Sequence, residues 1–505
     1  MLSAEEARLP DVPVPRPIAG RARSLALAVV LIAAFIDLIG VTILQVVLPA
    51  IREDLDASPA QLQWMLGGYT LALALGMVSG ARLGDMLGHK RMFVAGIAAF
   101  VVTSALCAAA PGAGLLVAAR ILQGLSAAAM IPQVLSQIQV MYAPRERGGP
   151  MAAFSALTGL AATLGPLLGP LMLRWDLAGQ SWRMVFWVNV PLGALAFVAS
   201  LRLLPDSRTA GAPRVDVPGA VLSSLGLLLV LYPLINAADR ASLPGWAYVS
   251  IAAGAAVLAA FVAYERRLGS RGGAPLLETS LFRFRSVNGG LLVQLLFFVP
   301  TMGFFMVFML FLQIGLGMSA TRAGLMILPW CIAVPVFATL SAAVLLPRIG
   351  RVTVQIGLVV MAAGWALLAV QADGATHGTA WTDLVWGVLV GGAGMGMLVA
   401  PLAQLTLDDV PVTDAGSGSA LYNTVTQLAA AVGVAVVGTY FFTEVRDTGR
   451  TAEAMADGYG EAFSGSLWLG IGLLAVALAA TPLLPRHPGR TAAAEAPRPE
   501  EPADA

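Results

Sequence analysis

Apolar residues occur along this chain in long runs, which short stretches rich in charge, proline or glycine separate. A helix needs about 20 apolar residues to cross the roughly 30 Å hydrocarbon core of a membrane. The runs therefore predict an all-α membrane protein with about fourteen transmembrane helices. The predicted spans are residues 25–51, 64–84, 92–112, 115–142, 152–173, 184–204, 217–237, 247–265, 288–312, 323–346, 353–371, 383–406, 417–442 and 464–484.

Composition and loop charge agree with this pattern. Hydrophobic residues make up 58% of the 505 residues and charged residues 12%, whereas soluble chains have about 45–50% apolar and about 25% charged residues. Lys and Arg collect in the even-numbered loops, which predicts that these loops and both termini are cytoplasmic. The acidic stretch DDVPVTD, 408–414, is the exception. A net charge of +1 gives no indication of a nucleic-acid partner.

The segments outside the predicted spans are short and polar. Residues 1–24 and 486–505 are rich in proline and charge, so we expect disordered cytoplasmic tails there. No loop exceeds roughly thirty residues, which excludes a large catalytic domain and an enzyme of that kind. Cys107 and Cys331 both lie inside apolar runs, so we expect small core residues and no extracellular disulfide framework.

Asp37 lies near the middle of the first predicted span, in FIDLIGVTILQ. An aspartate at the centre of a spanning helix costs about 2.5 to 3.5 kcal/mol on insertion scales. It is the only carboxylate near the centre of a predicted span. Intramembrane ionisable groups are functional by default, although a buried aspartate can also serve only to hydrogen-bond a neighbouring helix.

A second ionisable group, Arg120, lies in RILQGLSAAAM of the fourth span. An arginine in a membrane needs an acceptor, and Gln123, Gly124 and Ser126 give this helix a thin surface that a neighbouring helix can approach closely. The alternative is an arginine that extends to the membrane interface, because Arg120 lies near the start of the run.

The fifth span contains GLAATLGPLLGP, in which Gly159, Gly165 and Gly169 recur at short spacing. Pro166 removes one backbone hydrogen bond, so this helix should kink and pack closely. A plain packing role would explain the glycines but explains the repeated Gly-Pro pair less easily.

The stretch ARLGDMLGHKR, 81–91, lies at the predicted cytoplasmic end of the second span. Asp85, a turn at Gly88, and the bases Lys90 and Arg91 can form a charge network that holds two helices together, which is a natural conformational latch. Anchoring by the positive-inside rule is the alternative, and it does not explain Asp85.

These stretches resemble the signature motifs of the major facilitator superfamily, in particular its group of fourteen-span drug:proton antiporters. The Gly-Pro stretch of the fifth span resembles the antiporter signature of that group. Two departures are that Pro170 replaces the second glycine of this signature, and that Gly40 stands where many relatives carry aspartate, three residues after Asp37. The resembling stretches are 42–51, 81–91, 120–130, 159–170, 181–193 and, more loosely, 414–438.

The resemblance implies a major facilitator fold with two six-helix halves that rock about a central site, plus two extra helices. We expect the halves at 25–204 and 287–485 and the extra helices, with cytoplasmic loops, at 205–286. The implied protein is a monomer in the bacterial cytoplasmic membrane that uses no cofactor and exports lipophilic drugs or antibiotics in exchange for protons. Uptake by symport, or a sensor with the same fold, is the alternative.

In this scheme Asp37 carries the coupling proton, and Arg120 adjusts how strongly Asp37 holds it. Burial favours the neutral carboxyl, whereas a nearby guanidinium favours the carboxylate, so one conformation can hold the proton and another can release it. Amide, aromatic and methionine side chains of the spans would bind a neutral or singly cationic substrate. The candidates are Gln45, Gln123, Gln133, Gln137, Gln294, Phe298, Gln404, Asn423 and Gln427, with Phe297, Phe304 and Phe305 nearby.

Overall fold

The computed structural model describes residues 20–143, 146–175, 179–207, 216–237, 244–271, 273, 275–276, 279–376, 379, 381–411, 415–445 and 451–487. Thirteen helical segments within this part are long and apolar enough to cross a membrane. The helix Gly148–Trp175, with 28 residues, is long enough as well. The helices therefore agree with the expected count of about fourteen.

The N-terminal half consists of long helices that satisfy their own backbone hydrogen bonds, as a membrane requires. The first helix is longer than predicted at both ends, and its residues 20–24 fall in the segment expected to be a disordered tail. The helices are α1 (Gly20–Leu55), α2 (Pro59–Leu87), α3 (His89–Ala108), α4 (Ala113–Met141), α5 (Gly148–Trp175), and the sixth span, built from η3 (Ser181–Arg183), α6 (Met184–Trp187) and α7 (Asn189–Leu203).

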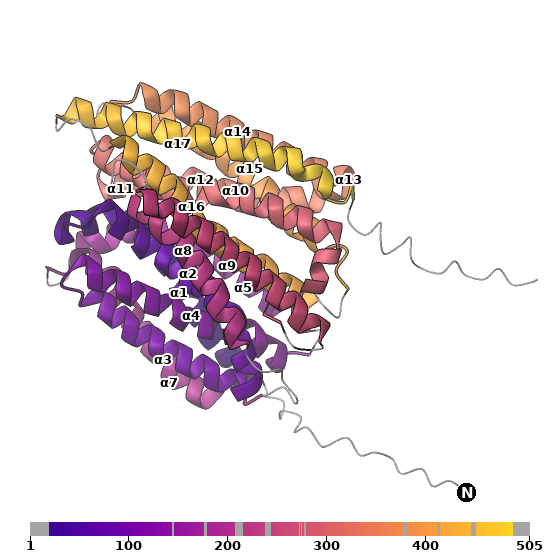
Figure 1. Cartoon of the computed structure of the whole chain (residues 1–505). Coiled ribbons are helices and arrows are strands. Elements are labelled where there is room, and N and C mark those ends of the chain that lie inside the picture. Colours follow the sequence, from indigo (N-terminus) through magenta and orange to yellow (C-terminus); the bar gives the residue numbers. More distant parts are fainter. Residues whose placement is uncertain are drawn as a thin grey trace, which may run out of the picture.

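Two helices follow, α8 (Val217–Ala237) and α9 (Gly245–Ser270), and they pack against each other. In addition, α8 contacts α2 of the first half and α16 of the second, where Leu231 and Ile235 join a small apolar cluster. These two helices fall inside the segment 205–286 that we expected to link the halves, and Figure 1 shows them in magenta.

The C-terminal half repeats the pattern of long helices, and two of its spans contain one π-helical turn each. Such turns occur mostly as local irregularities, frequently at functional sites. The elements are η4 (Thr279–Arg283), α10 (Arg285–Leu310), η5 (Phe311–Gly315), α11 (Ala320–Met326), α12 (Leu328–Leu340), η6 (Ser341–Leu345), α13 (Leu346–Ile349), α14 (Val352–Asp373), α15 (Trp381–Leu407), α16 (Ala415–Val445), α17 (Ala452–Ala480) and η8 (Thr481–Leu483).

The two halves form separate layers of helices, indigo to purple and orange to yellow in Figure 1. Each layer packs mainly within itself: α2 against α4, α3 against α4 and α1 against α5 in one, and α14 against α15, α10 against α16 and α12 against α15 in the other. The α2–α16 contact is the most extensive one between them. This is the arrangement of two bundles with a shared interface that the sequence predicted.

We call the end of the bundle at which α1 ends, at Leu55, the outer end. Three hydrogen bonds join the halves within the described part of the chain, and all three lie toward this end. Gln313 Nε2 donates to the carbonyl of Val46 (2.8 Å), Arg52 Nη1 to Tyr459 Oη (3.1 Å), and Thr439 Oγ1 to Gln63 Oε1 (3.4 Å). The halves are therefore closed on each other at the outer end.

Several sequence predictions fall outside the described residues. These are the tail before Gly20, the tail after His487, and Asp414 of the acidic stretch after α15.

Candidate functional site

Asp37 lies on α1 and is 4% exposed, so its carboxyl is removed from water. The hydroxyl of Tyr69, on α2 and 1% exposed, donates a hydrogen bond to Asp37 Oδ1. A buried carboxyl group without a hydrogen-bond partner is very costly, and this hydroxyl gives Asp37 such a partner.

Arg120, on α4, lies on the other side of the same tyrosine. Its guanidinium carbon is 4.0 Å from the centroid of the Tyr69 ring, a cation–π contact in a buried setting. No ion pair joins Asp37 directly to Arg120 among the described residues. Tyr69 therefore lies between the two side chains, with its hydroxyl on Asp37 and its ring face under Arg120.

Two further groups hold the arginine in place. Nε donates to the carbonyl of Met65 (3.1 Å) and Nη1 to Oε1 of Gln123 (2.6 Å), while Nη2 has no hydrogen-bond partner in the described part of the chain. Gln123 in turn donates to Ser104 Oγ on α3 (2.7 Å). The network thus joins α1, α2, α3 and α4 through one acid, one base and the polar groups between them.

The latch residues lie where α2 ends and α3 begins, at the end of the first bundle opposite the outer end. Gly88 connects the two helices with a φ of +106°, a backbone conformation that favours glycine. Asp85 Oδ1 lies 3.5 Å from Nε2 of His89, and His89 Nδ1 lies 2.8 Å from Oε1 of Gln133. The amide of Gln133 donates to the carbonyl of Gly80 (2.8 Å).

This arrangement changes the roles expected for the bases of the latch. Gln133 uses its amide group as a donor, so its carbonyl oxygen accepts from His89 Nδ1, and Nε2 of His89 faces Asp85. Lys90 and Arg91 have no ion pair with a described residue. His89, not Lys90 or Arg91, therefore carries the contact with Asp85 in this structure.

The glycines of the antiporter stretch pack α5 against α1. A Cβ atom at Gly165 would overlap the Oγ1 and Cβ atoms of Thr42, and one at Gly169 would lie 3.4 Å from Val46 Cβ. Pro166 lies between them and lines the cavity described below. Gly159 belongs to α5, but its surroundings lie outside the described residues.

A cavity of about 340 Å³ lies where α1, α5, α10, α12 and α15 meet, between the two halves. Fourteen residues line it, and none of them is acidic or basic. They include Gln45, Pro166, Phe305, Trp330 and Cys331, together with three methionines. Its volume is within the range of small-molecule sites, about 300 to 1,000 Å³.

An aromatic cluster supports one wall of this cavity. Trp330 stacks on Phe304 with ring centroids 5.2 Å apart and meets Phe305 edge to face at 5.5 Å. Behind them, Phe304 also stacks on Phe308 (5.1 Å) and on Trp365 (5.6 Å). Rings packed in this way have little freedom, so the wall is rigid.

Gln45 is the one residue of the nine substrate candidates that lines the cavity. The structure places the other eight elsewhere: Gln123 in the Arg120 network, Gln133 in the latch, Gln137 beside the carbonyl of Pro205 (3.5 Å), Gln294 between Tyr422 and Thr426, Phe298 against Phe297, Asn423 bonded to the carbonyl of Ser419, and Gln404 and Gln427 on other faces of α15 and α16.

Three site residues were not predicted for these roles. Tyr69 stands in an apolar run with no local feature that indicates a carboxylate partner. Trp330 and Cys331 are part of an ordinary apolar span, and Cys331 was expected to be a core residue. Only the relative rotation of the helices brings these side chains to the site.

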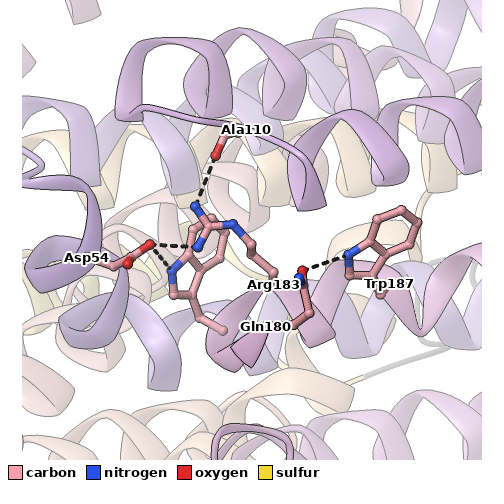
Figure 2. Close-up of polar contacts among 6 residues, drawn as sticks. Asp54, Ala110, Gln180, Arg183 and Trp187 are labelled. Atoms are coloured by element: carbon pink, nitrogen blue, oxygen red, sulfur yellow. Dashed lines mark hydrogen bonds and ion pairs between the residues drawn. The ribbon is translucent and has the colours of Figure 1, made fainter. Parts of the chain in front are cut away.

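A polar cluster closes the outer end of the first half (Figure 2). Arg183 donates to Asp54 Oδ2 (2.7 Å) and to the carbonyl of Ala110 (3.2 Å), and Trp182 Nε1 donates to the same Asp54 oxygen (3.0 Å). Trp187 Nε1 bonds to Gln180 Oε1 (3.2 Å). The SWRMVFW stretch thus ties the end of α1 to the α3–α4 connection.

Two helical bundles with a small, mostly apolar cavity between them, and a buried acid on one of the helices that line it, are the arrangement expected of a multi-pass membrane transporter. The sequence model of the family described as the Major Facilitator Superfamily matches residues 30–434 of this chain. The chain therefore belongs to the major facilitator superfamily, as its motifs predicted.

Known relatives are named for antibiotic export. The chain is 42% identical over 441 residues to the "Probable actinorhodin transporter" of Streptomyces coelicolor, which covers 87% of this chain and 76% of that protein. It is 33% identical over 471 residues to a "Cephamycin export protein" of Amycolatopsis lactamdurans, with 91% and 92% covered.

Solved structures agree on the fold. A bacterial homologue of the human lysosomal transporter Spinster, in an inward-facing and occupied conformation, superposes with a TM-score of 0.64 at 14% identity and covers 92% of this chain and 97% of that one. A peptide transporter in complex with sulfate gives 0.61 at 16% identity, with 91% and 95% covered.

Proposed function

We propose that this protein exports lipophilic small molecules, such as drugs or antibiotics, across the bacterial cytoplasmic membrane in exchange for protons. The observation that carries the proposal is the buried group of Asp37, Tyr69 and Arg120, because the helix of Asp37, α1, also lines the cavity between the halves. The names of the relatives support the kind of substrate.

The surroundings of Asp37 support proton coupling. Burial favours the neutral carboxyl, while the Tyr69 hydroxyl and the Arg120 charge favour the carboxylate. All three side chains lie on different helices of one bundle, so a small change in helix packing alters this balance. Protonation in one conformation and release in the other would couple the proton gradient, with no further cofactor, to transport.

Alternating access follows from the contacts between the halves. The three hydrogen bonds at the outer end break when that end opens, and the Asp85–His89–Gln133 latch lies at the opposite end of the first half. We propose that 25–204 and 287–485 rock against each other, with α8 and α9 between them, as a monomer whose two termini are cytoplasmic.

Proteoliposomes test the proposed function. Purified protein with an imposed pH gradient should accumulate a lipophilic probe in one gradient direction and not in the reverse. Equal flux in both directions, together with equal flux in the absence of a gradient, would contradict antiport and favour a passive carrier. The absence of any protein-dependent flux would favour a non-transporting sensor.

A further inference from the structure

We propose that the cavity selects uncharged, flat aromatic molecules and rejects organic cations, and that Gln45 provides the hydrogen bond that orients them. The inference rests on the proposed export function, because it assigns the substrate class of that site. It comes from the chemistry of the lining residues and from the order in the aromatic wall behind them.

The lining holds no carboxylate that could balance a positive charge. Its fourteen residues include no acidic or basic side chain. Asp37, the nearest acid along α1, is not part of the lining, since its Oδ1 accepts from Tyr69 within the first bundle. A cation that enters the cavity loses its water without a compensating charge, which is costly in an apolar site.

Aromatic rings can also bind cations, but only through an open ring face. Trp330 is 2% exposed, and one of its faces is stacked on Phe304. Phe305 meets the Trp330 ring edge to face. Trp330 therefore offers little open ring face to a cation, and the polarizable sulfur of the three lining methionines suits the face of a flat aromatic ligand.

Gln45 is the polar group available to such a ligand. It is half-buried in the lining and makes no hydrogen bond to another described residue. Among the other lining side chains that carry a polar group, Thr42 already donates to the carbonyl of Ile39 (3.0 Å), and Trp330 is only 2% exposed. The amide of Gln45 can donate to a carbonyl or accept from a hydroxyl of the ligand, which fixes its orientation.

The charge of the substrate also decides how transport responds to voltage. With Asp37 as the one coupling carboxylate, exchange of one proton for one uncharged molecule moves one positive charge inward per cycle. Exchange of one proton for a monovalent cation moves none. Export of the predicted class should therefore respond to a membrane potential as well as to a pH gradient.

A matched pair of probes tests the selectivity: 9-anthracenemethanol, which is uncharged, and (9-anthracenylmethyl)trimethylammonium, which carries a permanent charge on the same ring system. Equilibrium dialysis against the purified full chain gives a Kd for each. The expected result is at least tenfold tighter binding of the alcohol. Equal binding, or tighter binding of the ammonium compound, would overturn the inference.

Two variants place the selectivity at Gln45. Gln45→Leu should weaken binding of the alcohol several-fold, and Gln45→Glu should invert the preference toward the ammonium compound. Gln404→Glu, the same change at an exposed position of α15 outside the lining, should keep the wild-type preference. A wild-type preference in folded Gln45→Glu, or its loss in Gln404→Glu, would overturn the assignment to Gln45.

Transport of the same probes separates this inference from the proposed function. Gradient-driven efflux of the alcohol from right-side-out vesicles that increases with an inside-negative potential supports both. Flux of both probes at equal rates overturns the selectivity and leaves proton-coupled export standing. Preferential binding of the alcohol without any flux supports the selectivity and contradicts the export function.

Discussion

The close contact between α1 and α5 should make Gly165 intolerant of even one added methyl group. The Cβ of Gly165→Ala would overlap Oγ1 and Cβ of Thr42 and would lie 3.3 Å from the backbone nitrogen of Ile43. Overpacking of this kind costs about 1–3 kcal/mol. The helical preference of alanine over glycine returns about 1 kcal/mol, so we expect a net loss of up to about 2 kcal/mol.

Gly169→Ala is the matched control in the same helix. Its added Cβ would meet Val46 Cβ at 3.4 Å and Ile43 Cγ2 at 3.5 Å, which is ordinary van der Waals contact. This variant should therefore be as stable as the natural protein or slightly more stable. Thr42→Gly, which removes both overlapping atoms, should restore part of the loss in Gly165→Ala.

The assay is the fraction of monodisperse protein that remains after heating in detergent, followed by size-exclusion chromatography with fluorescence detection. Gly165→Ala should lose this fraction at a lower temperature than Gly169→Ala. Gradient-driven flux should fall with it, because α1 carries both Asp37 and Gln45. Equal stability of the two variants, or greater damage in Gly169→Ala, would refute the packing argument.

Three further changes test other parts of the account. Tyr69→Phe removes the hydroxyl that donates to Asp37 but keeps the ring under the guanidinium, so substrate binding should persist while proton-driven flux falls at least tenfold and its pH profile shifts. Gln313→Leu removes the hydrogen bond to the carbonyl of Val46 across the outer end, so labelling from outside by an impermeant maleimide at Cys331, which lines the cavity, should increase. Arg183→Ala breaks the ion pair between Arg183 and Asp54 in Figure 2. Because this pair is partly exposed, the loss of stability should stay below about 1 kcal/mol. A loss of several kcal/mol would mean that the cluster is a main support of the outer end.

The positions of the helices could be predicted from the sequence because each span is an apolar run of sufficient length. The ends were less accurate: α1 runs from Gly20 to Leu55 and not from 25 to 51. Beyond the apolar run, Arg52 and Asp54 find hydrogen-bond partners in the folded protein, and the helix continues through both. Composition alone does not locate that point.

The site could be predicted only in part, because residue type does not fix the rotation of a helix. Asp37 and Arg120 stood out as charges in apolar runs, and the structure brings both to Tyr69. Nothing in the sequence around Tyr69 indicates this role. Likewise, the candidate amides were chosen by type and span, and only the packing of both halves leaves Gln45 on the cavity.

The central claim is that Asp37 carries the coupling proton, and Asp37→Asn tests it most directly. This change keeps the size and hydrogen-bonding capacity of the side chain but removes the titratable group. Two measurements on the same proteoliposomes are needed: uptake of a lipophilic probe driven by a pH gradient, and exchange of labelled for unlabelled probe without a gradient. Exchange should persist and gradient-driven uptake should be lost; a variant that responds to the pH gradient like the natural protein would mean that Asp37 does not carry the coupling proton.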